Sequence, residues 1–143
     1  MPLQIVSARD FDPPPGDGQE DPQHVGNLID GRPDTVWATE HYYSRDVGGL
    51  KSGVGVIFKL AARSTVRSVK IHALDADWSA SVYVSDQPPT SPPAGLADGS
   101  GSNVPSDATI PILQPKPGQY VLLWITYLPA SGKLRIAEVE LVS

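Results

Sequence analysis

The side chains best suited to recognising a ligand lie together in residues 39–51, TEHYYSRDVGGLK. Aromatic rings stack on the C–H faces of sugars, while arginine, histidine and aspartate side chains hydrogen-bond to pairs of hydroxyl groups. A segment that offers both kinds of contact predicts recognition of a glycan. Its candidate ligand-binding residues are His41, Tyr42, Tyr43 and Arg45.

Two further groups could widen that contact. Asp77 and Trp78 follow each other in LDADWS, and Tyr127 stands before the final hairpin. The alternative interpretation is structural: the tyrosines cover one end of the domain, Arg45 pairs with an aspartate, and Trp78 begins a strand. Surface ion pairs contribute only about 0 to 1 kcal/mol and need no function. Residue types alone leave both interpretations open.

Carboxylates gather in two other segments. FDPPPGDGQEDP, residues 11–22, has four acidic residues, but its three consecutive prolines stiffen it and it lacks the full EF-hand pattern. We expect a solvated acidic loop there. NLIDGRPDTVW, residues 27–37, contains an Asp-Gly turn dipeptide, and its acidic side chains could merely cap that turn, with Arg32 neutralising them.

The sequence gives little support for an enzyme. The three histidines lie in different predicted elements without metal-ligand spacing, and no nucleophile elbow, phosphate loop or zinc motif occurs. Glu138 and Glu140 share one face of a strand, whereas a glycosidase needs two carboxyl groups that flank a cleft. We therefore predict a non-catalytic domain.

Composition restricts the class of protein further. The chain has 143 residues, enough for one domain, and its 15 prolines and 13 glycines predict many turns. A net charge of −5 without a basic cluster disfavours binding to nucleic acid. No cysteine is present, so disulfides and thiolate metal sites are excluded. No apolar run could span a membrane, and the N-terminus lacks a signal core, so a role outside the cytoplasm would make this chain an excised piece.

The elements that must position these residues are strands. Apolar and polar residues alternate with a period of two, interrupted by Gly, Pro, Asp and Ser, which predicts an antiparallel sandwich or barrel. Residues 54–60 form a half-buried strand whose glycines indicate close backbone approach, and residues 120–126 are apolar on both faces and hence central. Residues 85–109 predict a long surface connection. The other expected strands are residues 3–8, 69–73, 80–84 and 134–142.

The order of these segments resembles the galactose-binding-like, discoidin or coagulation-factor C-type, family. NLIDGRPDTVW is similar to its A-x-D-G-x-x-x-T-x-W segment and RIAEVELVS to its closing I-x-I-x-E-I-E-V strand, with VIFKL, STVRSVKIHAL, SVYVSD and GQYVLLWIT in the expected order between them. The resemblance implies one domain over residues 1–143, all-β, an antiparallel jelly-roll β-sandwich with its first and last strands adjacent. The family's His-Arg-Asn set is missing, so galactose or fucose specificity is not implied.

A metal site follows from the same resemblance. In this family the corresponding turn often holds a structural Ca²⁺, which needs six to eight oxygen ligands. Carried over by position, the side-chain ligands here would be Asp30, Asp34, Thr35 and Glu138.

A narrower resemblance concerns location and ligand. FDPPPGDGQEDP, the following turn and TEHYYSRDVGGLKSGVGV are similar to the C-terminal domain of actinobacterial MviN-type lipid II flippases. This implies an extracytoplasmic domain of a membrane-anchored protein, monomeric in isolation, that binds cell-wall glycan or a lipid-linked peptidoglycan precursor. The alternative is a protein-interaction or structural module that docks a cell-envelope partner and has no sugar site.

Overall fold

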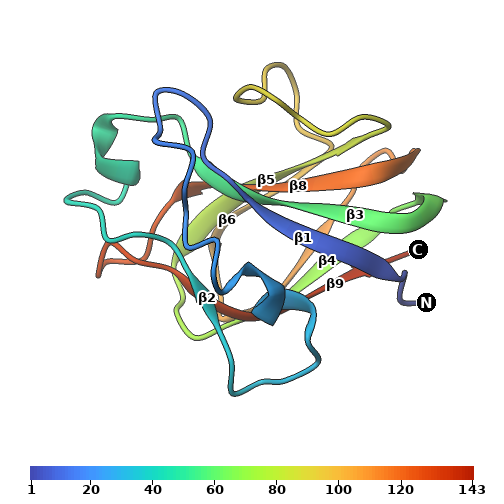
Figure 1. Ribbon diagram of the computed structural model, residues 1–143, viewed down its shortest axis with the longest axis horizontal. Helices are drawn as coiled ribbons and strands as arrows, with labels where there is room; N and C mark the ends of the chain where they lie inside the picture. The colour runs from blue at the N-terminus through green and yellow to red at the C-terminus, as the bar shows by residue number, and fades with distance from the viewer.

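Two antiparallel sheets packed face to face make up the computed structural model, which describes residues 1–143 (Figure 1). One sheet has the strand order β1-β3-β8-β5-β6 and the other β2-β9-β4-β7. The predicted all-β antiparallel sandwich is therefore confirmed. The elements are β1 (Ile5–Phe11), η1 (Val25–Ile29), β2 (Trp37–Ala38), η2 (Val47–Gly49), β3 (Val54–Thr65), β4 (Ser68–Ala73), β5 (Trp78–Ser85), β6 (Gly99–Val104), β7 (Asp107–Pro111), β8 (Pro117–Tyr127) and β9 (Arg135–Val142).

Burial along the strands explains why these residues form them. In β5 buried and half-buried residues alternate without exception, because only one face of this strand meets the main core. β8 is the middle strand of the five-stranded sheet and is buried on both faces from Val121 to Ile125, as its continuous apolar run predicts. The core between the sheets contains Trp37, Phe58 and Trp78, all fully buried.

The prediction that residues 54–60 are only half-buried is wrong, because all of them except Lys59 are buried. Ile57 points away from the main core but is still buried, because it joins Phe11, Leu122 and Trp124 in a second apolar cluster on the outer face of the five-stranded sheet. The predicted close backbone approach is confirmed: a Cβ at Gly55 would lie 2.3 Å from the carbonyl oxygen of Leu123.

The expected long connection over residues 85–109 is also wrong in its second half. β6 occupies Gly99–Val104, and β7 begins at Asp107. The sequence of β6, GSGSNV, carries almost no apolar signal. A Cβ at Gly99 would lie 2.4 Å from the carbonyl oxygen of Pro111, so this strand packs through its backbone.

The chain ends meet, but the first and last strands do not pair with each other as the family resemblance implied. β1 and β9 belong to different sheets, but the Leu3 amide donates to the Leu141 carbonyl at 2.8 Å and Pro2 bridges Val142. Both termini consequently lie at the end of the sandwich opposite to the 39–51 loop (Figure 1). None of the helices has the length and apolar character needed to cross a membrane.

Candidate functional site

Three connecting segments, residues 11–22, 39–51 and 128–134, meet at one end of the sandwich (Figure 1). Backbone hydrogen bonds fasten the second to the third: the Thr39 amide donates to the Leu134 carbonyl at 2.9 Å, and the Tyr42 amide to the Gly132 carbonyl at 2.9 Å. Because loops held by a rigid scaffold are the usual place for binding, this end is the candidate site.

A buried polar network fastens the first segment to the second. The Glu20 carboxylate accepts from the Glu40 amide at 2.7 Å and from the Tyr42 hydroxyl at 2.9 Å. The Lys51 ammonium donates to Asp12 at 2.9 Å and to the Tyr42 hydroxyl at 2.8 Å. Asp12 is 2% exposed and Glu20 0%. The prediction of a solvated acidic loop is therefore wrong for these two residues, although Asp17 is exposed as expected.

The electrostatics of this network are unbalanced, because two carboxylates share one ammonium. Lys51 Nζ lies 2.9 Å from Asp12 and 3.8 Å from Glu20. Burial raises the pKa of Glu20 to about 7, against the opposing effect of its hydrogen bonds from Glu40 and Tyr42. Burial also raises the pKa of Asp12, although the hydrogen bond from Lys51 opposes it. The network holds the loops in place at a cost in desolvation.

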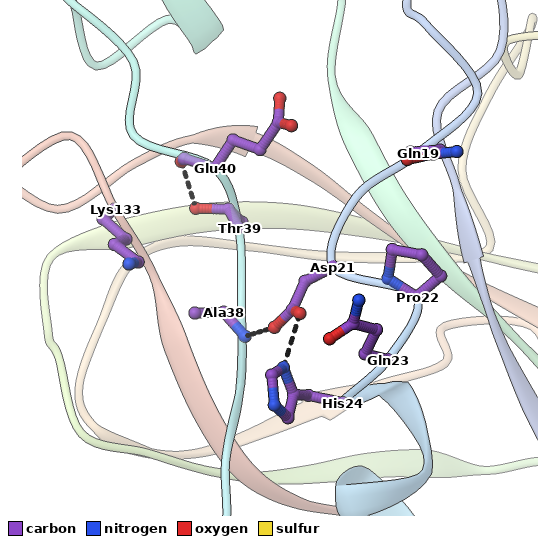
Figure 2. Close-up of a pocket in the computed structure, with 9 residues that line it drawn as sticks. All are labelled: Gln19, Asp21, Pro22, Gln23, His24, Ala38, Thr39, Glu40 and Lys133. Atoms are coloured by element: carbon purple, nitrogen blue, oxygen red, sulfur yellow. Dashed lines mark hydrogen bonds and ion pairs between the residues drawn. The ribbon is translucent and has the colours of Figure 1, made fainter.

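A polar groove of about 480 Å³ lies beside this network (Figure 2). Figure 2 shows the Asp21 carboxylate between the backbone of Ala38 and the ring of His24, with distances of 3.2 Å to the Ala38 amide and 2.6 Å to His24 Nδ1. The lining residues are Gln19, Asp21, Pro22, Gln23, His24, Ala38, Thr39, Glu40 and Lys133. Sequence reasoning missed this groove. Its only signal was the acidic content of residues 11–22.

A second groove, of about 220 Å³, lies along the same segment and brings four predicted ligand residues together. Its lining residues are His41, Tyr42, Tyr43, Ser44, Arg45, Ala130, Ser131 and Gly132. The two tyrosines differ: the Tyr42 hydroxyl is committed to Glu20, whereas the Tyr43 ring is fully exposed. Tyr43 is therefore the open aromatic surface of this segment.

Arg45 connects two other predicted ligand-binding residues, Asp77 and Tyr127, to this groove. Its guanidinium donates to the Leu128 carbonyl at 2.9 Å and to the Asp77 carbonyl at 2.7 Å, and it lies 4.7 Å from the centre of the Tyr127 ring. Asp77 and Tyr127 thus adjoin Arg45, and Arg45 has a positioning role. The prediction that Trp78 contacts a ligand is wrong, because this side chain is fully buried in the core.

The predicted metal ligands converge in part. The Thr35 hydroxyl donates to Asp30 at 2.5 Å, and the Arg32 amide donates both to Asp30 at 2.9 Å and to Glu138 at 3.1 Å. Asp34 is held instead by the Arg32 guanidinium, at 2.9 Å. Burial, together with the adjacent Asp30, raises the pKa of Glu138 to about 7. Two carboxylates and one hydroxyl therefore meet between the turn and β9, with no third carboxylate or histidine among them.

Comparisons with known proteins bear on the fold. Neither the scan against protein-family models nor the search of curated proteins found a match. Among solved structures, the chain is similar to the CBM32 of AlyQ in complex with 4,5-unsaturated mannuronic acid, at 19% identity and a TM-score of 0.71, over 99% of this chain and 98% of that one.

Two further solved structures are similar to this chain over almost its whole length. A pectin-binding carbohydrate-binding module matches at 17% identity and a TM-score of 0.70, over 99% of this chain and 92% of that one. The family 32 module of Clostridium perfringens NanJ, in complex with galactose, matches at 15% identity and a TM-score of 0.61, over 96% and 97%. The predicted galactose-binding-like β-sandwich is thereby confirmed as the fold.

Proposed function

We propose that this domain is a non-catalytic carbohydrate-binding module whose glycan lies across residues 39–45. The observation that carries the proposal is the fully exposed Tyr43 ring, which lies on a backbone segment pinned to residues 128–134 and borders a polar groove. An aromatic ring in water has no packing role, and a pinned segment presents it to a ligand at little cost in conformational entropy.

The two grooves follow each other along residues 38–45 and suit different parts of one ligand. His41 and Ser44 border the Tyr43 ring, and Asp21, His24 and Lys133 supply donors and acceptors in the larger groove. Carbohydrate rings need both kinds of contact, since they present apolar C–H faces and hydroxyl edges. The solved structures of this fold named above support the proposal, because their titles describe complexes with, or binding to, carbohydrates.

The ligand class and the location of the domain can be proposed more narrowly. Following the resemblance to the flippase domain, we propose cell-wall glycan or a lipid-linked peptidoglycan precursor as the ligand, and a position outside the cytoplasm within a membrane-anchored protein. None of the structures named above is such a flippase, so this stays a prediction.

We also propose that Asp30, Thr35 and Glu138 hold a structural Ca²⁺. The residues fit, because two neighbouring carboxylates and a hydroxyl are oxygen ligands, and a cation between them would offset both the burial and the adjacent Asp30 that raise the pKa of Glu138. Bound Ca²⁺ would tie the 27–37 turn to β9. Calorimetry after EDTA treatment, then with excess Ca²⁺, is expected to show a rise in melting temperature. A melting temperature that does not change would exclude the site, and Glu138→Gln should abolish any rise.

One observation favours the alternative, a protein-interaction module. Leu50 is largely exposed in the segment that also carries Tyr43. A segment that exposes both an apolar side chain and an aromatic ring suits a protein partner as well as a sugar. Leu50→Ala should weaken binding of a protein partner from the cell envelope and leave glycan binding unchanged.

The experiment that separates the two functions is a glycan array that includes muropeptides, probed with the wild type, Tyr43→Ala and Leu96→Ala. Leu96 is almost fully exposed but lies in the 85–99 connection, so Leu96→Ala is the matched control for losing an exposed apolar side chain. We expect at least one glycan to bind, with a loss of about tenfold or more in Tyr43→Ala alone. Absence of binding to every glycan would refute the proposed function.

A further inference from the structure

The outer face of the five-stranded sheet carries a second candidate site, which strand register defines. Residues opposite each other on neighbouring strands point to the same face of a sheet. Lys59 lies opposite Ser7 on one side and Tyr120 on the other, and Arg9 lies opposite Ile57. Arg9 and Lys59 are therefore diagonal neighbours on this face, roughly 7 to 8 Å apart at their Cα atoms.

A groove of about 220 Å³ lies at this position, lined by Ser7, Arg9, Ile57, Lys59, Pro88 and Tyr120. Ile57 is buried and forms an apolar floor, while Pro88 comes from the 85–99 connection, the yellow segment of Figure 1. Lys59 Nζ lies 6.0 Å from the centre of the Tyr120 ring. The groove thus combines an apolar surface with two cationic side chains and suits a ligand of one ring.

The charges of this groove lack partners within the chain. Neither Arg9 nor Lys59 has a carboxylate oxygen within 4.0 Å, and neither side chain donates a hydrogen bond to another residue. Most of the other cations are engaged in ion pairs: Arg32, Lys51, Arg63, Lys116 and Arg135. Two unpaired neighbouring cations on a chain of net charge −5 form a local positive patch that attracts an anion.

We propose that this groove binds a carboxylate-bearing sugar ring, that is, a uronate residue. The Arg9 guanidinium offers a planar pair of donors that matches a carboxylate, and the Lys59 ammonium adds a second charge. In this proposal Tyr120, Pro88 and Ile57 contact the apolar face of the sugar ring, and Ser7, which lines the same groove, hydrogen-bonds to a sugar hydroxyl. The site shares no residue with the two grooves at the loop end, so it does not depend on the function proposed for them.

The test is a titration of the isotope-labelled domain, followed by backbone amide chemical shifts, with methyl β-D-glucuronide and with the neutral methyl β-D-glucoside. We expect saturable shifts at Arg9, Lys59 and Tyr120 for the glucuronide, with a dissociation constant in the millimolar range that weakens as salt is added. The neutral sugar should bind at these residues at least fivefold more weakly. Equal binding of the two sugars would overturn the proposal.

Variants identify the site. Arg9→Gln and Lys59→Gln should each weaken glucuronide binding at least fivefold, whereas Arg67→Gln should have no effect, since Arg67 is exposed and lies between β3 and β4, away from the groove. The amide shifts of residues 39–45 and those of Arg9, Lys59 and Tyr120 are followed separately in the same spectra, so a failure at the loop end and a failure here are distinguishable. Acetate binding as tightly as the glucuronide would overturn the sugar assignment, because the groove would then recognise only an anion.

Discussion

Replacing Lys51 with methionine tests whether the buried network fixes the loops. The Lys51 side chain is 11% exposed and lies 2.9 Å from Asp12 and 3.8 Å from Glu20. At an effective dielectric constant of about 20, Coulomb attraction at these distances is about 6 and about 4 kcal/mol. Desolvation of the ammonium cancels much of this attraction. Since methionine leaves two buried carboxylates without a counter-charge, we expect unfolding free energy to fall by about 3 to 5 kcal/mol at pH 8.

The loss should depend on pH, because burial raises the pKa of Glu20 to about 7. At pH 5 Glu20 is already protonated in the folded wild type, so only the interaction with Asp12 is lost there. Urea denaturation followed by tryptophan fluorescence measures both values. Lys116→Met is the control. Lys116 pairs with Asp98 at 3.1 Å but is half exposed, so this variant should lose less than about 1 kcal/mol of unfolding free energy. If Lys51→Met loses as little unfolding free energy as the control, or loses the same amount at pH 5 and pH 8, the buried network does not hold the loops as described.

Two further predictions concern Glu20 and Trp78. The pKa of Glu20 is about 7 in the folded chain and 4.5 unfolded, so the folded state binds the proton more tightly and the stability of the wild type should fall as pH rises from about 5 to about 8, by at most about 3 kcal/mol. Glu20→Gln should flatten this part of the stability profile in urea denaturation, and an unchanged slope would assign it to other groups. Trp78→Phe should destabilise the domain by about 1 to 3 kcal/mol without changing glycan affinity, since the ring is buried in the core. A variant that keeps its stability but loses affinity in calorimetry would restore Trp78 as a ligand residue.

Strands with a strong apolar pattern were predictable from the sequence. β8 has five consecutive buried residues, and β5 alternates regularly, so period and hydrophobicity place both. β6 was missed because GSGSNV pairs with β5 through backbone hydrogen bonds and approaches the Pro111 carbonyl of β7 closely at Gly99, features that side-chain patterns do not record. Burial of Ile57 was missed for a related reason, since the second apolar cluster draws its members from β1, β3 and β8.

The candidate site was predictable where its residues are close in sequence. His41, Tyr42, Tyr43 and Arg45 line one groove because they belong to one pinned segment. Lys51 is 39 residues from Asp12, and Glu20 is 22 residues from Tyr42. Such pairings depend on how three loops pack at the end of the sandwich, and an acidic loop whose partner lies far along the chain looks like a solvated one.

The most direct test of the proposed glycan-binding function is a map of where a glycan binds. The isotope-labelled domain is titrated with the strongest ligand from the glycan array, and backbone amide shifts are recorded. We predict that the largest changes occur at residues 39–45, with smaller ones at residues 19–24 and 130–133, and that Tyr43→Ala removes them at the same ligand concentration. Changes confined to other parts of the chain, or changes that persist in Tyr43→Ala, would contradict the assignment of this end of the sandwich as the recognition site.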